Sequence, residues 1–216
     1  MNTNKKVAII GLGSIGQAVA GNLAKSSRSF IVAGRDHAKV EAVAAQWGLA
    51  VEVAPSIDAA IKQADLILLS IPYGEIAPLI QEHAEALRGK IVIDPSNPIA
   101  PLPEGGFKKV IGEDQSAGEL IGASLPEGVR LVKAFGTLGA QSLSEGAFAE
   151  PRKVLFYASN CPSVQGNIDA LITDAGFAPL YLGGLEHSIR LEVFGSLHEF
   201  GALGKTVTLE EAKAVL

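Results

Sequence analysis

Short apolar runs alternate with longer amphipathic stretches along much of the chain. This alternation is typical of strands that are joined by crossover helices in a parallel sheet. The first apolar runs lack a strict polar alternation, which is expected when helices cover both faces of the sheet. The pattern predicts strands at residues 6–10, 30–34, 50–53, 66–70, 91–94 and 131–133, and helices at residues 15–25, 38–47, 57–62, 76–87 and 117–124.

The later part of the chain is less regular. Prolines and glycines indicate loops at residues 97–106 and 135–151. The alternation then resumes, and it predicts one more strand, helix and strand that extend the same sheet. These elements are expected at residues 154–158, 163–175 and 177–182.

The segment after Gly184 has the spacing of a C-terminal helix. Four of its apolar residues would lie near one helix face: Leu191, Phe194, Leu197 and Leu203. We therefore predict an α/β fold with a Rossmann-type doubly wound, mainly parallel sheet and a C-terminal helical cap. Residues 1–184 would form the main domain, and residues 185–216 a helical segment that packs on it or on a second subunit.

The composition supports a folded domain and argues against several classes of function. Hydrophobic residues make up 48% of the 216 residues and the mean hydropathy is +0.29, which argues against disorder. The net charge of −5 comes without a basic cluster, so nucleic acid is not an expected partner. No apolar stretch approaches the roughly 20 residues of a membrane span, so no membrane association is expected.

Cysteine and histidine usage indicates a reducing compartment. The single Cys161 can form no internal disulfide, and four scattered histidines give no zinc spacing. We expect a cytoplasmic protein with no metal site, in which Cys161 is an inert thiol. His37 and His83 are expected to be solvated helix residues.

A glycine motif follows the first predicted strand and opens the first predicted helix. Its residues are Gly11, Leu12, Gly13, Ser14, Ile15 and Gly16. Gly11 permits the tight turn, Gly13 lets the backbone approach a pyrophosphate, and Gly16 lets helix and strand pack closely. The helix N-terminus offers unpaired N–H groups to the phosphates. The main domain is therefore predicted to bind a dinucleotide; the alternative is a glycine-rich turn without a ligand.

The end of the second predicted strand bears on the choice of cofactor. An NAD enzyme usually has an acidic residue there for the ribose 2′-hydroxyl, whereas this strand ends in Gly34 and Arg35. A guanidinium grips a 2′-phosphate, and Lys39 adds a second positive charge. Asp36 is either the displaced ribose ligand or the N-cap of the next helix. We favour the cap, and NADP(H) over NAD(H).

Two proline-containing loops follow the fourth and fifth predicted strands. They are Ser70-Ile71-Pro72-Tyr73 and Asp94-Pro95-Ser96-Asn97-Pro98. Ligands of doubly wound sheets bind beyond the carboxyl ends of the strands. These loops are therefore expected to flank the nicotinamide ring, the alternative being that they are ordinary rigid turns.

Together these features resemble the NADP-dependent reductases that exchange hydride between NADP and the deazaflavin coenzyme F420. The cytosolic domains of the STEAP metalloreductases are also similar. Most of the first 140 residues carry the resemblance: the glycine motif, Gly34-Arg35 with Lys39, Ser70-Ile71-Pro72, Asp94-Pro95-Ser96-Asn97-Pro98, and Val132-Lys133-Ala134-Phe135 followed by Thr137. A later run, Gly183-Gly184-Leu185-Glu186, resembles the start of the family's last helix.

The resemblance implies that Arg35 and Lys39 hold the 2′-phosphate and that Ala134 and Phe135 belong to the cofactor site. The chain departs from the family at Gly34, where the family often has serine, and at Gly136, where it has asparagine. The resemblance therefore bears more strongly on the NADP site than on the site of the deazaflavin.

Hydride transfer to a flavin-like ring requires close stacking and exclusion of water but no acid–base dyad. The small residues Thr137, Gly139 and Ala140 are the expected place for that second ring. His187 is either a proton donor to the substrate or a surface residue. The surface interpretation is favoured, with Glu186 and Arg190 forming an exposed ion pair.

Three functional hypotheses follow. The first is an NADP(H)-dependent oxidoreductase that transfers hydride between NADPH and a flavin-like or deazaflavin (F420) acceptor. The second is an NADPH-dependent reductase of a small carbonyl or imine substrate, with His187 or Tyr73 as the candidate proton donor. The third is a non-catalytic NADP(H)-binding regulator. Because the C-terminal segment is short for a substrate domain, a homodimer is expected.

Overall fold

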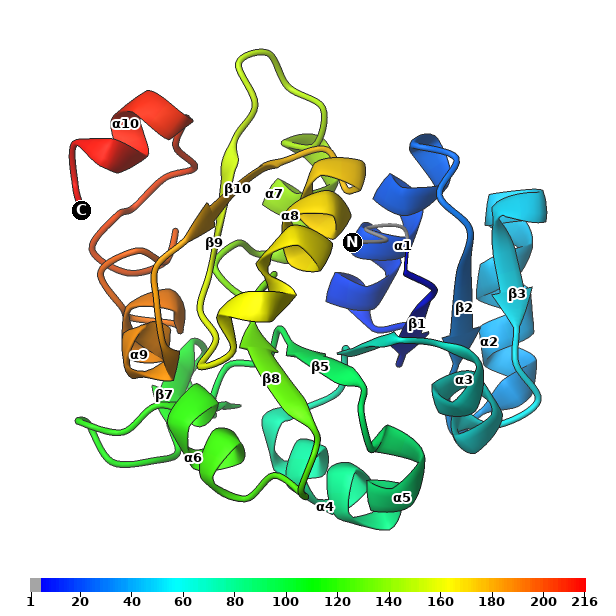
Figure 1. The fold of residues 1–216 in the computed structure, drawn as a ribbon. Helices are drawn as coiled ribbons and strands as arrows, with labels where there is room; N and C mark the ends of the chain where they lie inside the picture. The colour runs from blue at the N-terminus through cyan, green and yellow to red at the C-terminus, as the bar shows by residue number, and fades with distance from the viewer. Residues whose placement is uncertain (1–4) are drawn as a thin grey trace.

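The computed structural model describes residues 5–216, and its centre is a sheet of six parallel strands in the order β3-β2-β1-β4-β5-β8 (Figure 1). The chain order reverses between β1 and β4, which is the arrangement of a doubly wound nucleotide-binding sheet. The strands are β1 (Val7–Ile10), β2 (Phe30–Ala33), β3 (Val51–Val53), β4 (Leu66–Leu69), β5 (Ile91–Asp94) and β8 (Arg130–Lys133). The fold class predicted from the hydrophobic pattern is confirmed.

Helices cover both faces of this sheet. Figure 1 shows α1 and α8 on one side of the sheet and α4, α5 and α6 on the other. The helices up to the last strand of the sheet are α1 (Ser14–Lys25), α2 (His37–Ala44), α3 (Ile57–Gln63), α4 (Tyr73–Glu82), α5 (Ala84–Leu87) and α6 (Ala117–Ala123). The predicted helix at residues 76–87 therefore starts three residues earlier and is divided at His83.

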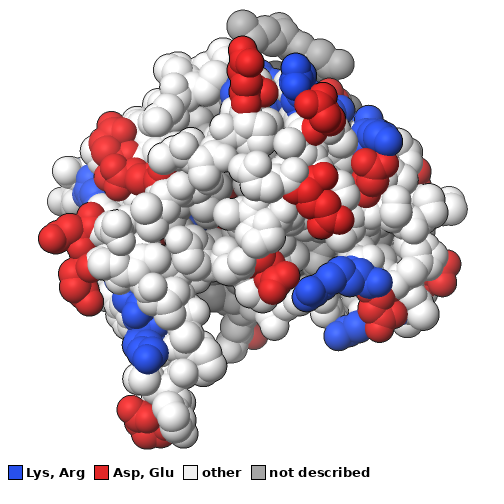
Figure 2. All heavy atoms as spheres, turned by 90° about the horizontal axis from the view of Figure 1, so that it is seen from below, with Lys and Arg blue, Asp and Glu red and all other residues white. Residues whose placement is uncertain are grey.

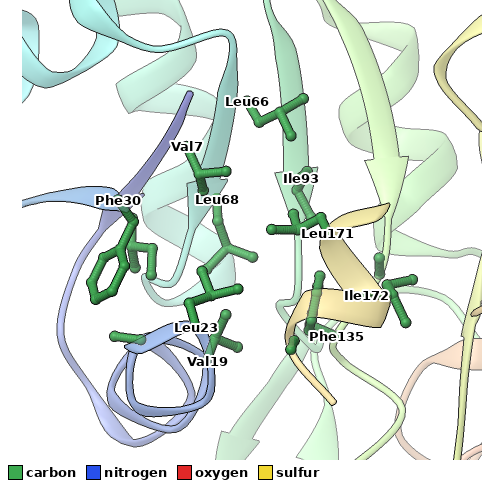
Figure 3. Close-up of a cluster of buried hydrophobic side chains, with 14 of the residues drawn as sticks. Val7, Val19, Leu23, Phe30, Leu66, Leu68, Ile93, Phe135, Leu171 and Ile172 are labelled. Atoms are coloured by element: carbon green, nitrogen blue, oxygen red, sulfur yellow. The ribbon is translucent and has the colours of Figure 1, made fainter. Parts of the chain in front are cut away.

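The core beneath α1 and α8 contains large aliphatic side chains (Figure 3). Val7, Leu68 and Ile93 from the central strands meet Leu23 of α1 and Leu171 of α8. All five are at most 1% exposed. Burial on both faces explains why these strands show continuous apolar runs rather than alternation.

The strands β9 (Val154–Tyr157) and β10 (Ala178–Tyr181) form a separate two-stranded parallel sheet around α8 (Gln165–Asp174). The expectation that they extend the main sheet is wrong. Within residues 5–216, the backbone pairing that joins this part of the chain to the main sheet is an antiparallel bridge between Lys133, at the end of β8, and Ala158, just after β9. Since β9 runs opposite to β8, it cannot add a further parallel strand.

Two other regions expected to be irregular contain short elements. In the first, β6 (Ile99–Pro101) forms an antiparallel hairpin with β7 (Phe107–Lys109), which follows directly after the region, and α7 (Ala140–Glu145) lies in the second. In the described residues 5–216 no helix is long and apolar enough to cross a membrane.

The predicted continuous C-terminal helix is not present. After a 3₁₀ turn (Leu185–His187) come only α9 (Ser188–Leu191) and, after a series of turns, α10 (Leu209–Lys213). Phe194 has a φ of 74° and is 55% exposed, so it does not share a face with buried Leu197. Gly201 packs directly against the Gly195 carbonyl, so the chain folds back on itself where a helix would continue. Residues after Gly184 still cap β9, through Leu191, Leu197 and others.

Candidate functional site

The glycine loop between β1 and α1 is as tight as the motif predicts. Gly11 has a φ of 92°, and a Cβ there would collide with the Ser70 carbonyl oxygen. A Cβ on Gly16 would collide with the Gly11 carbonyl oxygen. These two glycines therefore serve the backbone packing of β1, α1 and the loop after β4.

Gly13 has a different environment. It is the N-cap of the twelve-residue α1, and no side chain among the described residues caps that helix end. No atom outside its chain neighbours lies within 4 Å of the position of a Cβ on Gly13. Open space in front of a helix N-terminus is the setting in which backbone N–H groups bind phosphate.

A cavity of about 550 Å³ runs from this loop along the carboxyl edge of β1, β2 and β4. Gly11, Leu12 and Gly13 line one end, and Gly34, Arg35 and Lys39 line the other. The predicted pyrophosphate loop and the predicted 2′-phosphate ligands thus face one continuous space.

Asp36 is the N-cap of α2: its carboxylate accepts a hydrogen bond of 3.0 Å from the Lys39 N–H. The favoured interpretation of Asp36 as a cap agrees with this contact. Arg35 is directed across the cavity to α4, where its Nη1 lies 3.4 Å from Glu75 Oε2. Glu75 was not among the candidates from the sequence.

The two helix histidines differ. His37 is exposed and lies 3.6 Å from Glu41, as expected for a solvated residue. The His83 side chain is only 14% exposed and lines this cavity, so the expectation of a solvated His83 is wrong. The break between α4 and α5 at His83 turns this side chain inward.

A second cavity of about 380 Å³ continues from the first. The two share Gly13, Ser70, Ile71 and Pro72 on their walls. The remaining wall of the second cavity is formed by Ser14, Ile15, Tyr73, Pro95, Ser96, Asn97 and Ile99. The two proline loops therefore flank one space beyond the glycine motif, where a nicotinamide ring was expected.

Asn97 and Pro98 contribute mainly to structure. Asn97 donates to the Gly136 carbonyl at 3.2 Å, and its Oδ1 accepts from the Val193 N–H at 2.7 Å. The Pro98 ring is buried, and its carbonyl accepts from the Val110 N–H. Asn97 thus lines the second cavity while it connects the loop after β8 to the C-terminal segment.

Three residues expected near the rings lie elsewhere. Ala134 and Phe135 are 2% and 0% exposed in the main core, and they do not line either cavity. Thr137 is 1% exposed, and its buried hydroxyl has no hydrogen-bond partner among the described residues. The left-handed φ of 65° at Phe135 turns this loop into the core and away from the cavities.

The C-terminal segment covers this loop. The Glu199 N–H donates to the Thr137 carbonyl at 3.1 Å, and the Glu199 carboxylate accepts from the Gly139 N–H. The Phe200 ring packs against Gly139. The expected position of a second ring at Thr137 and Gly139 is therefore filled by the chain itself, and the open part of the site lies beside Tyr73 and Pro95.

A buried cluster of charges lies beneath this region. Lys133 at the end of β8 contacts Asp94 at the end of β5, with Nζ 2.8 Å from Oδ2, and the Ser96 carbonyl. Its Nζ also lies 3.8 Å from Oε1 of Glu192, which accepts from the N–H groups of Ala117 and Gly118 at the start of α6. The three charged side chains are at most 2% exposed.

Burial raises the pKa of Glu192, although Lys133 and the two N–H groups oppose the shift. Burial also raises the pKa of Tyr73, and the carboxylates of Glu192 and Asp94 add to that effect. Burial lowers the pKa of His198, whose Nδ1 accepts from the Phe200 N–H. Tyr73 therefore remains a neutral hydroxyl donor on the wall of the second cavity.

The surface interpretation of His187 agrees with its position. Its side chain is 36% exposed, lies 3.8 Å from Glu186 and does not line either cavity. The expected ion pair between Glu186 and Arg190 is absent from the described residues. Arg190 instead donates to Ser196 at 3.2 Å, because the chain turns after α9.

Sequence reasoning missed the chemical importance of Lys133, Asp94, Glu192 and His198. Lys133 and Asp94 entered only as parts of motifs, and Glu192 and His198 lie in the segment that was expected to form a C-terminal helix. One signal was available: Asp94 and Lys133 each end an apolar strand, and those strands are expected to finish at the ligand-binding edge.

Comparison with known proteins agrees with this geometry. Residues 6–98 match the family described as NADP oxidoreductase, coenzyme F420-dependent. The matched range contains the glycine loop, the wall of the first cavity and all of the wall of the second except Ile99, and the match confirms the resemblance inferred from the motifs. A search of curated proteins found no significant match.

Solved structures share the fold over most of the chain. A hypothetical protein from Sinorhizobium meliloti superposes with a TM-score of 0.80 at 29% identity, over 94% of this chain and 95% of that one. A protein assigned provisionally as an F420-dependent NADP reductase from an Arthrobacter species gives 0.70 at 25% identity, over 85% and 86%. An imine reductase from Myxococcus stipitatus, in complex with NADP⁺, gives 0.59 at 17% identity, over 92% and 58%, which is a likeness of fold alone.

Proposed function

We propose that this chain, whose residues 6–98 match the coenzyme F420-dependent NADP oxidoreductase family, transfers hydride between NADPH and a flavin-like or deazaflavin acceptor. The observation that carries the proposal is one continuous cavity with the glycine loop at one end and Arg35 and Lys39 at the other. A second cavity adjoins it at the loop and leaves room for an acceptor.

The residues present fit a bound NADP(H). The free N–H groups at the start of α1 would hold the pyrophosphate, because Gly13 leaves the approach to that helix end open. Arg35 and Lys39 would hold the 2′-phosphate through charge-assisted hydrogen bonds. Bound NADPH supplies the hydride. Ile71, Pro72 and Pro95 would orient the nicotinamide end and exclude water from it.

A titration of wild type and Arg35→Ala with NADPH and with NADH tests the cofactor assignment. Loss of a charge-assisted contact to the 2′-phosphate should weaken NADPH binding by about 10- to 100-fold and leave NADH binding nearly unchanged. Arg88→Ala is a matched control, since Arg88 is an exposed arginine paired with Glu85 and does not line the cavity. The assignment would be refuted if wild type bound NADPH and NADH with equal affinity and Arg35→Ala did the same.

The acceptor is tested separately, by mixing NADPH-loaded protein with oxidised F420, FMN, FAD and riboflavin. The proposal expects NADPH oxidation with at least one of these acceptors, at a rate well above that of protein-free controls. Tight NADPH binding without turnover on any acceptor would instead favour the non-catalytic regulator.

One observation favours a second candidate function, the reduction of a small carbonyl or imine. Tyr73 lines the second cavity and its hydroxyl stays protonated at neutral pH. The Tyr73 hydroxyl could therefore give a proton to the carbonyl oxygen or imine nitrogen as hydride reaches the carbon, and then regain a proton from solvent. Tyr73→Phe should then lower kcat by about 10²- to 10⁴-fold while the Kd of NADPH stays within about twofold. An unchanged kcat would exclude this role.

We also propose that the protein forms a homodimer. Phe194 and Phe200 are 55% and 65% exposed, and both belong to the segment that adjoins the loop after β8. Burying such rings against a second copy would remove apolar surface from water. Light scattering after size-exclusion chromatography should give twice the chain mass of 22.4 kDa, and Phe194→Ser with Phe200→Ser should shift the mass toward the monomer.

A further inference from the structure

Opposite charges meet at the end of the larger cavity where the 2′-phosphate would lie. Arg35 follows β2, and Glu75 lies in the first turn of α4. Their Nη1 and Oε2 atoms are 3.4 Å apart, and both residues line the cavity. The two side chains are 81% and 53% exposed, so the pair is accessible to a ligand that enters from solvent.

A 2′-phosphate would meet two opposing effects here. It carries close to two negative charges at neutral pH, so that Arg35 and Lys39 attract it and the Glu75 carboxylate repels it. Glu75 also pairs with the Arg35 guanidinium, so this group is less available to bind the phosphate.

The opposite holds for a ribose with a free 2′-hydroxyl. Such a hydroxyl carries no charge to be repelled. A carboxylate is the group that accepts a hydrogen bond from it in NAD enzymes. Asp36 does not fill that role in this structure, because its carboxylate caps α2.

We propose that Glu75 is a specificity-determining residue, which weakens NADPH binding relative to what Arg35 and Lys39 alone would give and so lowers the preference of the site for NADPH over NADH. The inference rests on the proposed function, because it requires the 2′-phosphate to lie at Arg35. Glu75 acts on the choice of cofactor and has no contact with the reacting atoms.

The experiment compares the Kd values of NADPH and NADH for wild type and Glu75→Gln, which removes the charge and keeps the size. NADPH should bind about three- to tenfold more tightly to the variant, and NADH should change by less than about twofold. The gain should shrink when the ionic strength is raised from about 0.05 M to about 0.5 M, because salt screens exposed charges. Glu82→Gln is the control: Glu82 lines the same cavity, and its carboxylate lies 4.0 Å from the His83 ring rather than against Arg35.

Two results would overturn the inference. One is unchanged or weaker NADPH binding by a Glu75→Gln protein that melts at the wild-type temperature. The other concerns the double variant. When Arg35 is already alanine, the pair cannot form, so adding Glu75→Gln should strengthen NADPH binding by less than half of what it does in wild type. An undiminished gain in NADPH affinity would overturn the inference. If Arg35→Ala weakens NADPH binding but Glu75→Gln does not strengthen it, only this inference fails. If wild type does not bind NADPH, both this inference and the proposed function fail.

Discussion

Gly11 and Gly13 belong to the same glycine motif but have different roles. Gly11 packs on the Ser70 carbonyl with a left-handed φ, whereas Gly13 faces open space with an ordinary φ of −72°. The first position therefore serves the fold, whereas the second leaves the approach to the N-terminus of α1 open, as the proposed phosphate site requires.

Alanine substitutions should show this difference. Gly11→Ala should lose about 1–3 kcal/mol of unfolding free energy, because a Cβ there is both strained and in collision with the backbone. Gly13→Ala should melt close to wild type but bind NADPH at least about tenfold more weakly, since its methyl group would stand where the pyrophosphate approaches. Thermal melts and cofactor titrations of the two variants check this. Equal losses of stability at the two positions would contradict the assignment.

The geometry of the glycine loop and of the Asp36 cap could be predicted because it follows from short local motifs. The glycine loop, Arg35 and the Asp36 cap each depend on a few neighbours in the chain. Glu192 could not be placed in the same way. Its burial comes from contacts with Lys133 and with the start of α6, which are distant in sequence.

At the scale of elements, the start of α2 shows how a cap and a binding site share residues. The carboxylate of Asp36 satisfies the Lys39 N–H, while the Lys39 side chain lines the cavity. The cap thus fixes the turn that presents Arg35 and Lys39 on the same wall.

Asp36→Ala should cost about 0.5–2 kcal/mol of stability, as is usual for the loss of an N-cap. NADH binding should remain within about twofold of wild type, because this carboxylate is used by the helix. Asp36→Ser, which can also cap, should restore most of the stability. A large loss of NADH affinity in both variants would instead identify Asp36 as a ribose ligand.

The elements of the main sheet could be predicted because each strand and its crossover helix follow a local apolar pattern. The separate β9–β10 sheet and the broken C-terminal segment could not. The direction of β9 relative to β8 depends on a bridge between Lys133 and Ala158, which no local pattern encodes. The C-terminal segment has helical spacing, but Gly195 and Gly201 pack against each other and fold the chain back.

At the scale of the whole molecule, charges of both signs are dispersed over the face shown in Figure 2 without an extended basic patch. The concentrated charge is instead internal, where Lys133, Asp94 and Glu192 join β8, β5 and the C-terminal segment. These contacts hold the segment beside the second cavity. Breaking a buried ion pair by removal of one partner costs about 3–5 kcal/mol, so this cluster is expected to control how firmly the segment is attached.

The cluster should make the stability of the whole molecule depend on pH. Burial raises the pKa of Glu192 above its ordinary value of 4.5, so the folded state binds this proton more tightly than the unfolded state does. The stabilisation from the bound proton is fully present below pH 4.5 and is lost as the pH rises through the raised pKa. Wild type should therefore lose stability relative to Glu192→Gln as the pH increases over this window.

Unfolding in urea at a series of pH values, for wild type, Glu192→Gln and the exposed control Glu186→Gln, measures this difference directly. The free energy of unfolding of wild type minus that of Glu192→Gln should fall with increasing pH, and the Glu186→Gln series shows how much of any fall comes from the loss of a carboxyl group as such. Because the amide side chain of the Glu192→Gln variant cannot accept hydrogen bonds through both of its terminal atoms, the variant can be less stable at every pH. The slope of this difference against pH, and not its size, therefore measures how much more tightly the folded state binds the Glu192 proton. A difference that does not change with pH would mean that Glu192 ionises as easily in the folded state as in the unfolded chain.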